Sequence, residues 1–150
     1  MQPKLVVVDG HALLFRAFFA VRGLTAPDGR PTNAVFGFLK SVTKILDRLD
    51  PQYLVVCLDS GAQTFRKAAF EDYKAQRKPV PPELVAQFPM LVDLLEAMSI
   101  PVLMRDGFEA DDLIAAVVGQ AEKEETGVII VSRDKDLMQL LSDTVSMYDD

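Results

Sequence analysis

Seven acidic residues of this 150-residue sequence stand where their carboxylates could hold metal ions. They form four short groups, each following a stretch rich in Val, Ile or Leu: Asp9; Asp59; Glu109, Asp111 and Asp112; Asp134 and Asp136. Acids suit the first turn of a helix, where unpaired N–H groups and the helix dipole favour negative charge. Capping explains one or two acids at the helix expected after Gly107, but not three. The excess predicts a shared acidic site.

Crowding of these acids predicts metal binding. Like charges in close proximity raise carboxyl pKa values, and their repulsion opposes a folding free energy of only about 5–15 kcal/mol. A cation relieves this repulsion, and ligands that are all oxygen favour Mg²⁺ or Mn²⁺ over zinc. Seven carboxylates exceed the needs of one Mg²⁺, so we expect two ions; ions about 3.5–4 Å apart can activate water and stabilise the leaving oxygen in phosphodiester cleavage. For any single acid, a helix cap or a turn is the simpler interpretation.

Five short apolar runs alternate with helical patterns along the chain. We expect strands at 4–8, 53–58, 100–104, 127–131 and 145–148, and helices at 11–21, 33–49, 82–98, 110–124 and 135–141. Pro89 should kink or split the helix at 82–98. The alternation predicts a three-layer α/β fold, in which a mostly parallel sheet carries helices on both faces. Ligands of such sheets bind beyond the carboxyl ends of the strands, so all seven acids should meet on one rim.

Composition indicates one ordinary globular domain, with 49% hydrophobic and 25% charged residues. The first 21 residues are interrupted by Asp9, His11 and Arg16, so we expect neither a signal peptide nor a membrane span, and a cytoplasmic protein. The single cysteine, Cys57, cannot form an internal disulfide and should pack as a small buried hydrophobe. His11 follows an acidic group, but such a histidine more often satisfies a local backbone group than contacts substrate.

The net charge of −6 argues at first against a nucleic-acid partner. Setting the seven acids aside leaves 16 basic against 15 acidic residues, so the rest of the chain is nearly neutral. Five of the basic residues, interleaved with aromatic ones, fall in the stretch 64–78: Arg66, Lys67, Lys74, Arg77 and Lys78. This basic-aromatic stretch is a candidate phosphate-binding surface, and Tyr73 within it could stack on a base. The alternative is a solvated helix face.

Together these residues resemble a known family, the 5′-nuclease (flap endonuclease-like, PIN-like) domain at the N-terminus of bacterial DNA polymerase I. The resemblance covers essentially the whole chain. It rests on Val7-Val8-Asp9-Gly10, Thr32 to Phe38, Asp59 with Phe65-Arg66, Tyr73 to Arg77, Gly107 to Asp112 and Asp134-Lys135-Asp136-Leu137. Glu-Ala-Asp-Asp and Asp-Lys-Asp-Leu about 20 residues apart are far more specific together than either motif alone.

The resemblance implies a role for each group of residues. One metal ion would be held by the acids that come first along the chain, namely Asp9, Asp59, Glu109, Asp111 and Asp112. Asp134 and Asp136 would contribute to the second ion. Lys74 and Arg77 would lie on a helical gateway over the site and stabilise charge on the scissile phosphate. Tyr73 would stack on a displaced base, and Arg66, Lys67 and Lys78 would bind DNA.

The expected activity is that of a metal-dependent 5′-3′ exonuclease or flap endonuclease, which hydrolyses DNA at 5′ ends, flaps or nicks in replication and repair. The family continues with a helix–turn–helix-type element that grips duplex DNA, and residues 1–150 correspond to the part before it. We expect a monomer, which in its natural gene is a candidate for fusion to a polymerase domain. Two other classes stay open: a phosphorylatable receiver-type signalling domain and a DNA-binding module without activity.

Overall fold

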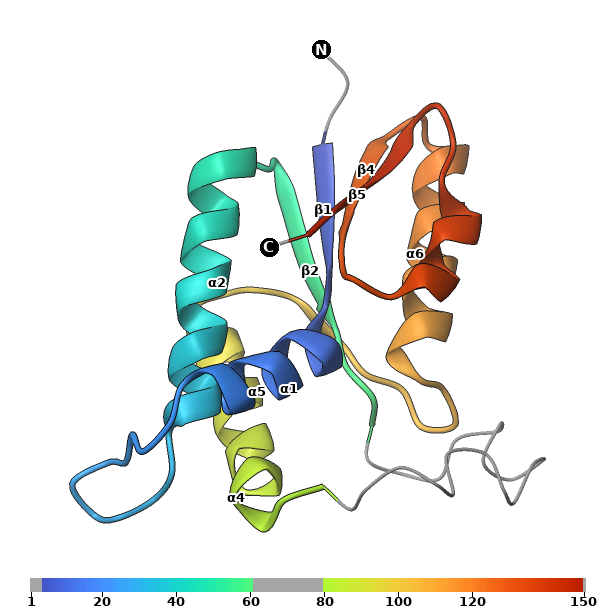
Figure 1. Cartoon of the computed structure of the whole chain (residues 1–150). Helices are drawn as coiled ribbons and strands as arrows, with labels where there is room; N and C mark the ends of the chain where they lie inside the picture. Colours follow the sequence, from blue (N-terminus) through green and yellow to red (C-terminus); the bar gives the residue numbers. More distant parts are fainter. Residues whose placement is uncertain (1–3, 61–79, 150) are drawn as a thin grey trace.

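The computed structural model describes residues 4–60 and 80–149, which fold around one parallel sheet (Figure 1). Its strands are β1 (Lys4–Asp9), β2 (Tyr53–Cys57), β3 (Val102–Leu103), β4 (Gly127–Val131) and β5 (Val145–Tyr148). Its helices are α1 (Gly10–Ala20), α2 (Asn33–Leu49), α4 (Pro82–Val85), α5 (Gln87–Ala97), α6 (Ala110–Lys123) and the 3₁₀ helix η1 (Lys135–Leu140). Residues 64–78, the basic-aromatic stretch, lie outside the described residues.

The strands lie in the order β3-β2-β1-β4-β5, and every pairing is parallel. In the centre, Val8 of β1 lies between Val56 of β2 and Val131 of β4. From β1 the chain moves outward through β2 to β3 on one side of the sheet. It then crosses to the other side of β1, where it forms β4 and β5. The sheet therefore has a topological switch point between the carboxyl ends of β1 and β4.

Alternation of side chains along β1 divides the core into two layers. Val6 and Val8 face a cluster built with α1, α2, α4 and α5, whereas Val7 faces a cluster built with α6 and η1. All three valines are fully buried, as expected of a strand covered on both faces. Figure 1 shows α1, α2 and α5 on one side of the sheet and α6 on the other. The predicted three-layer α/β fold is confirmed.

Two elements differ clearly in extent or type from the sequence prediction, and a third shows a predicted break. The strand expected at 100–104 is reduced to the two residues of β3. The helix expected at 135–141 is a 3₁₀ helix. The helix expected at 82–98 is split at Ala86, which confirms the predicted effect of Pro89: a helical proline cannot donate to the carbonyl four residues earlier, here that of Val85.

A buried polar network joins the start of α2 to its neighbours. Gln87 is fully buried, and its side-chain oxygen accepts hydrogen bonds from the backbone N–H groups of Ala34 (2.8 Å) and Val35 (3.1 Å). Its amide nitrogen donates to Asn33 Oδ1 at 2.8 Å. The Asn33 amide in turn donates to backbone carbonyls at the end of α1. The Gln87 oxygen thus supplies an acceptor that the N–H groups of a helix start lack within their own helix, and the Asn33 amide supplies a donor to carbonyls at the end of α1.

The described part of the chain contains no helix that is both long enough and apolar enough to cross a membrane. Cys57 is fully buried in β2, as predicted, and burial raises the pKa of its thiol to about 12.

Candidate metal centre

Asp9 lies at the switch point, where β1 ends and α1 begins. Its side chain caps α1 by accepting from the backbone N–H of Ala12, and only 4% of the residue is exposed. Gly10 lets the helix start directly against β2, because a Cβ there would lie 2.9 Å from the carbonyl oxygen of Cys57. The sequence Asp-Gly after a buried strand thus fixes one carboxylate at the centre of the rim.

Ser132 connects Asp9 to the end of β4. Its hydroxyl donates to Asp9 Oδ2 at 2.9 Å and accepts from the backbone N–H of Asp134 at 3.0 Å. Asp134 caps η1 by accepting from the N–H of Asp136 at 2.9 Å. Sequence analysis did not single out Ser132; the available signal was a hydroxyl two residues before an acid at a strand exit.

Three carboxylates converge at the switch point from three elements. Asp9, Asp111 and Asp134 each offer an oxygen, and these oxygens all lie within 4.8 Å of one another. Burial, as the largest cause, raises the pKa of Asp9. The pKa of Asp111 is raised to about 7, first by burial and then by the charges of four acids: Asp9, Asp134, Glu109 and Asp59. Four of the other six predicted acids therefore lie within electrostatic reach of Asp111.

The start of α6 is built to deliver Asp111 to this point. Gly107 turns the chain with φ of +88°, a conformation that favours glycine. Asp112 accepts from the backbone N–H of Glu109 at 3.0 Å, as the third-position acid of a capping box does. Asp59, just beyond β2, accepts from the N–H of Ala110 at 2.6 Å, which ties this helix start to the sheet.

The two remaining predicted acids lie beside the cluster. Asp112 and Asp136 line a cavity of about 460 Å³ between α6 and η1, together with Asp111 and Lys135. Asp136 is exposed, whereas Glu109 is 5% exposed. All seven acids thus occupy the predicted rim, where Asp9, Asp111 and Asp134 make the tightest group.

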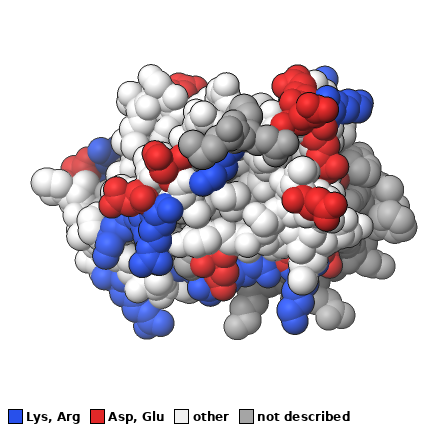
Figure 2. All heavy atoms as spheres, turned by 90° about the horizontal axis from the view of Figure 1, so that it is seen from above, with Lys and Arg blue, Asp and Glu red and all other residues white. Residues whose placement is uncertain are grey.

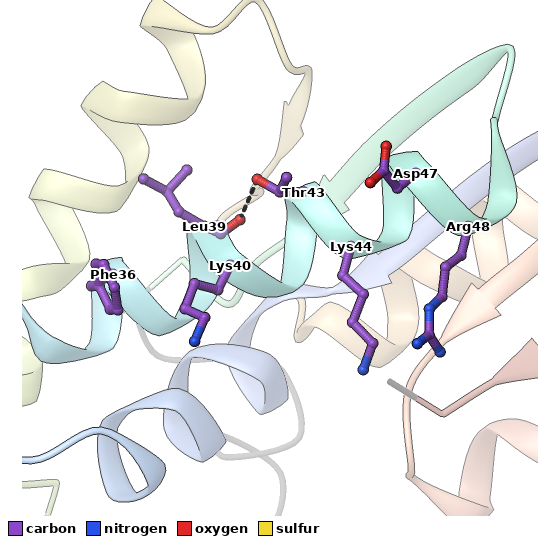
Figure 3. Close-up of a pocket in the computed structure, with 7 residues that line it drawn as sticks. All are labelled: Phe36, Leu39, Lys40, Thr43, Lys44, Asp47 and Arg48. Atoms are coloured by element: carbon purple, nitrogen blue, oxygen red, sulfur yellow. Dashed lines mark hydrogen bonds between the residues drawn. The ribbon is translucent and has the colours of Figure 1, made fainter.

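A second cavity, also of about 460 Å³, lies on α2. Figure 3 shows that Lys40, Lys44 and Arg48 extend from the same side of this helix, in line with Phe36. Figure 2 looks onto the end of the molecule where the strands begin, and Lys and Arg there lie beside Asp and Glu. The acid cluster is at the opposite end of the strands.

The predicted DNA-contacting residues all fall outside the described residues: Arg66, Lys67, Tyr73, Lys74, Arg77 and Lys78. The described chain shows only where their segment departs and returns, after Ser60 and before Val80. Since Asp59 belongs to the rim, the segment departs beside the acids.

The donor chemistry of the acid cluster fits a hard divalent cation. The three nearest groups are all carboxylates, and the pKa values of Asp9 and Asp111 are raised, first by burial and then by the charges of neighbouring acids. A cation would favour the ionised form of these carboxylates and so oppose both effects.

Residues 4–150 match a family described as the 5'-3' exonuclease, N-terminal resolvase-like domain. The chain belongs to this family. DNA polymerase I of Geobacillus stearothermophilus is 44% identical over 147 residues, which are 98% of this chain and 17% of the polymerase. A 5'-3' exonuclease of Aquifex aeolicus is 40% identical over 141 residues, which are 94% of this chain and 49% of that protein. The resemblance inferred from sequence is confirmed.

Two solved T5 structures have the same fold. The T5 D15 protein co-crystallized with metal ions superimposes with a TM-score of 0.71 at 25% identity, over 97% of this chain and 53% of that chain. The T5 5'-exonuclease with bound divalent zinc gives a TM-score of 0.69 at 25% identity, over 97% of this chain and 54% of that chain. The domain therefore spans about half of these structures and less than a fifth of the polymerase relative.

Proposed function

We propose that the chain is the N-terminal portion of a 5′-nuclease catalytic domain, which hydrolyses phosphodiester bonds of DNA at 5′ ends, flaps or nicks. The observation that carries the proposal is the convergence of Asp9, Asp111 and Asp134 at the switch point of a sheet from this family. Ligand sites of open α/β sheets lie at such points, and three carboxylates select a hard cation.

We assign Mg²⁺ or Mn²⁺ as the cofactor, with two ions. Asp9, Asp111 and Asp134 form the core of the ligand set, and four acids surround it: Asp59, Glu109, Asp112 and Asp136. When bound, the ions supply an activated water and stabilisation of the leaving oxygen. Asp111, whose pKa is raised to about 7, releases its proton when a cation is bound, so binding should strengthen as pH rises.

The protein groups around the acids orient them. Ser132 holds Asp9 and the backbone of Asp134 in one hydrogen-bonded chain, which fixes two ligands from neighbouring strands. Ala110 N–H holds Asp59. Such outer contacts set ligand direction, on which metal affinity depends.

The basic-aromatic stretch supplies the substrate contacts in this proposal. Lys74 and Arg77 stabilise charge on the scissile phosphate, and Tyr73 stacks on a displaced base. Arg66, Lys67 and Lys78 contact other phosphates of the DNA. This assignment is supported by the residues that precede the stretch, since Ser60, the last described residue before it, follows Asp59 of the rim.

The receiver-type alternative is disfavoured by the sheet order. Receivers of the CheY type have the strand order 2-1-3-4-5, whereas this sheet has the order 3-2-1-4-5. The position after β5 is also acidic, since Asp149 interacts there with Arg16 and Arg133, whereas a receiver needs a lysine after its last strand.

The test is incubation of the chain with a labelled 5′-flap duplex, with and without Mg²⁺. We expect Mg²⁺-dependent cleavage by the parent and none by Asp134→Asn. Binding without cleavage would identify a DNA-binding module instead. If the chain neither binds nor cleaves the duplex, the proposal is overturned.

A further inference from the structure

His11 contacts Asp59 at two points. Its Nδ1 accepts a hydrogen bond from the backbone N–H of Asp59 at 3.1 Å. Its Nε2 lies 3.7 Å from Asp59 Oδ2. Because Nδ1 accepts, the ring proton is on Nε2, on the side of the carboxylate.

Aromatic neighbours hold the imidazole ring in this orientation. The His11 ring lies 6.1 Å from the ring of Phe15 on α1 and 5.4 Å from that of Phe88 on α5, measured between centroids. The side chains of His11 and Asp59 are each only 27% exposed. The ring is thus fixed from two helices, and its direction toward the turn after β2 is set by packing.

Asp59 is held from the other side by α6. Its Oδ1 accepts from Ala110 N–H at 2.6 Å, one residue before Asp111. The charge of Asp59 also raises the pKa values of Asp9 and Asp111, so its carboxylate lies within electrostatic reach of the cluster. A shift of the turn would therefore move a carboxylate of the acid site.

From these contacts we propose that His11 is a positioning residue of the metal centre. It fixes the backbone of the turn after β2, and through that turn it fixes the direction of the Asp59 carboxylate. The inference rests on the proposed metal-dependent function. Residues that orient metal ligands typically contribute about 10–100-fold to metal affinity.

Binding of Mn²⁺ alone, followed by the electron paramagnetic resonance signal of the free ion, tests this inference. We expect His11→Ala to weaken Mn²⁺ binding by about 10-fold or more. His11→Asn places an acceptor near the position of Nδ1, so it should recover most of that loss. Mn²⁺ binding by His11→Ala that equals the parent overturns the inference. If the parent binds Mn²⁺ but leaves the 5′-flap duplex intact, the nuclease proposal fails, whereas weaker Mn²⁺ binding by His11→Ala still supports the inference.

A second measurement needs no substitution. The sequence contains one histidine, so the ¹⁵N–¹H imidazole correlations of the parent report on His11 alone. We expect the tautomer with the proton on Nε2 and a saturable shift of its signals when Mg²⁺ is added. A ring protonated on Nδ1, or signals that Mg²⁺ does not move, overturns the inference even if His11→Ala fails to fold.

Discussion

Asp111 responds strongly to the crowding of the site, because burial and four neighbouring acids raise its pKa to about 7 from an ordinary value of 3.8. Between pH 3.8 and about 7, Asp111 therefore carries a proton in the folded protein but not in the unfolded chain. The stabilisation from this proton is fully present below pH 3.8 and is lost as pH rises through about 7.

We expect the metal-free parent to lose stability between pH 5.5 and 8.5, and Asp111→Asn to lose less over the same range. The asparagine removes one charge from the crowded rim and cannot ionise. Thermal melts in a chelator at a series of pH values measure this. Asp47→Asn, at an exposed acid of α2, is the control and should keep the pH dependence of the parent. If metal-free Asp111→Asn is much less stable than the metal-free parent at pH 8.5, the Asp111 carboxylate has a structural role instead.

Lys74 and Arg77 are three residues apart, so on a helix they would direct two cations to one place. If they stabilise charge at the scissile phosphate, Lys74→Ala should lower the single-turnover cleavage rate by about a hundredfold or more, since each 1.36 kcal/mol of barrier is tenfold. DNA affinity should change much less. Rapid-quench kinetics at saturating enzyme, on a form of the protein that cleaves the 5′-flap duplex, measure the rate.

Comparison with neighbouring cations separates catalysis from general attraction. Arg77→Ala should behave like Lys74→Ala, whereas Lys67→Ala, which on a helix would lie about two turns from Lys74, should reduce affinity and leave the saturated rate unchanged. Equal rate losses at all three positions would leave a basic patch without a catalytic pair.

At the scale of the elements, Gln87 is the side chain that joins α5 to the start of α2. Gln87→Leu would leave the N–H groups of Ala34 and Val35 buried without their acceptor, and each such group costs about 1–3 kcal/mol. We expect a loss of about 2–4 kcal/mol in the free energy of unfolding, measured by urea denaturation. Gln120→Leu, at an exposed position of α6, is the matched control and should stay within about 0.5 kcal/mol of the parent. A similar small change for Gln87→Leu would contradict the role of the network.

The elements could be predicted where periodicity and packing agree. β1 has four consecutive apolar residues and is buried on both faces, so its type and its place in a parallel sheet follow from sequence alone. β3 could not be bounded in this way, because it is an edge strand paired only with β2, and pairing determines its two-residue length. The 3₁₀ form of η1 depends on the Asp134 cap and on packing of Leu137, which periodicity does not encode.

At the scale of the whole molecule, topology assembles the site from distant parts of the chain. The rim was predictable, because parallel strands bring their carboxyl ends to one edge and each acid follows a strand. The contacts that orient the acids were not, since Ser132 and Asp9 are 123 residues apart and no local pattern links them. The same holds for His11, whose partner Asp59 is 48 residues away.

The fold also determines at which end of the sheet basic side chains lie. The cations Lys40, Lys44 and Arg48 extend from one side of α2 (Figure 3). The last turn of α2 lies at the end of the sheet where strands begin, since the Lys4 side chain of β1 donates to the carbonyl of Leu49. The stretch 64–78 instead follows Asp59 and Ser60, which lie at the acid end. Screening limits exposed charges to a range of about 8 Å in physiological salt, so if this stretch binds DNA beside the acids, as proposed, the two groups of cations should act separately.

Two triple variants, each of which makes the net charge of −6 more negative by three, test whether local contacts or total charge govern DNA binding. One is Arg66→Gln, Lys67→Gln, Lys78→Gln, and the other is Lys40→Gln, Lys44→Gln, Arg48→Gln. We expect only the first to weaken binding to a 5′-flap duplex, and to make the dependence of log affinity on log salt shallower by up to about 0.9 for each phosphate that the protein no longer neutralises. Titrations in a chelator between about 50 and 200 mM salt measure both quantities without cleavage. Equal losses in the two variants would show that long-range charge governs binding, and would contradict the assignment of DNA contacts to the stretch 64–78.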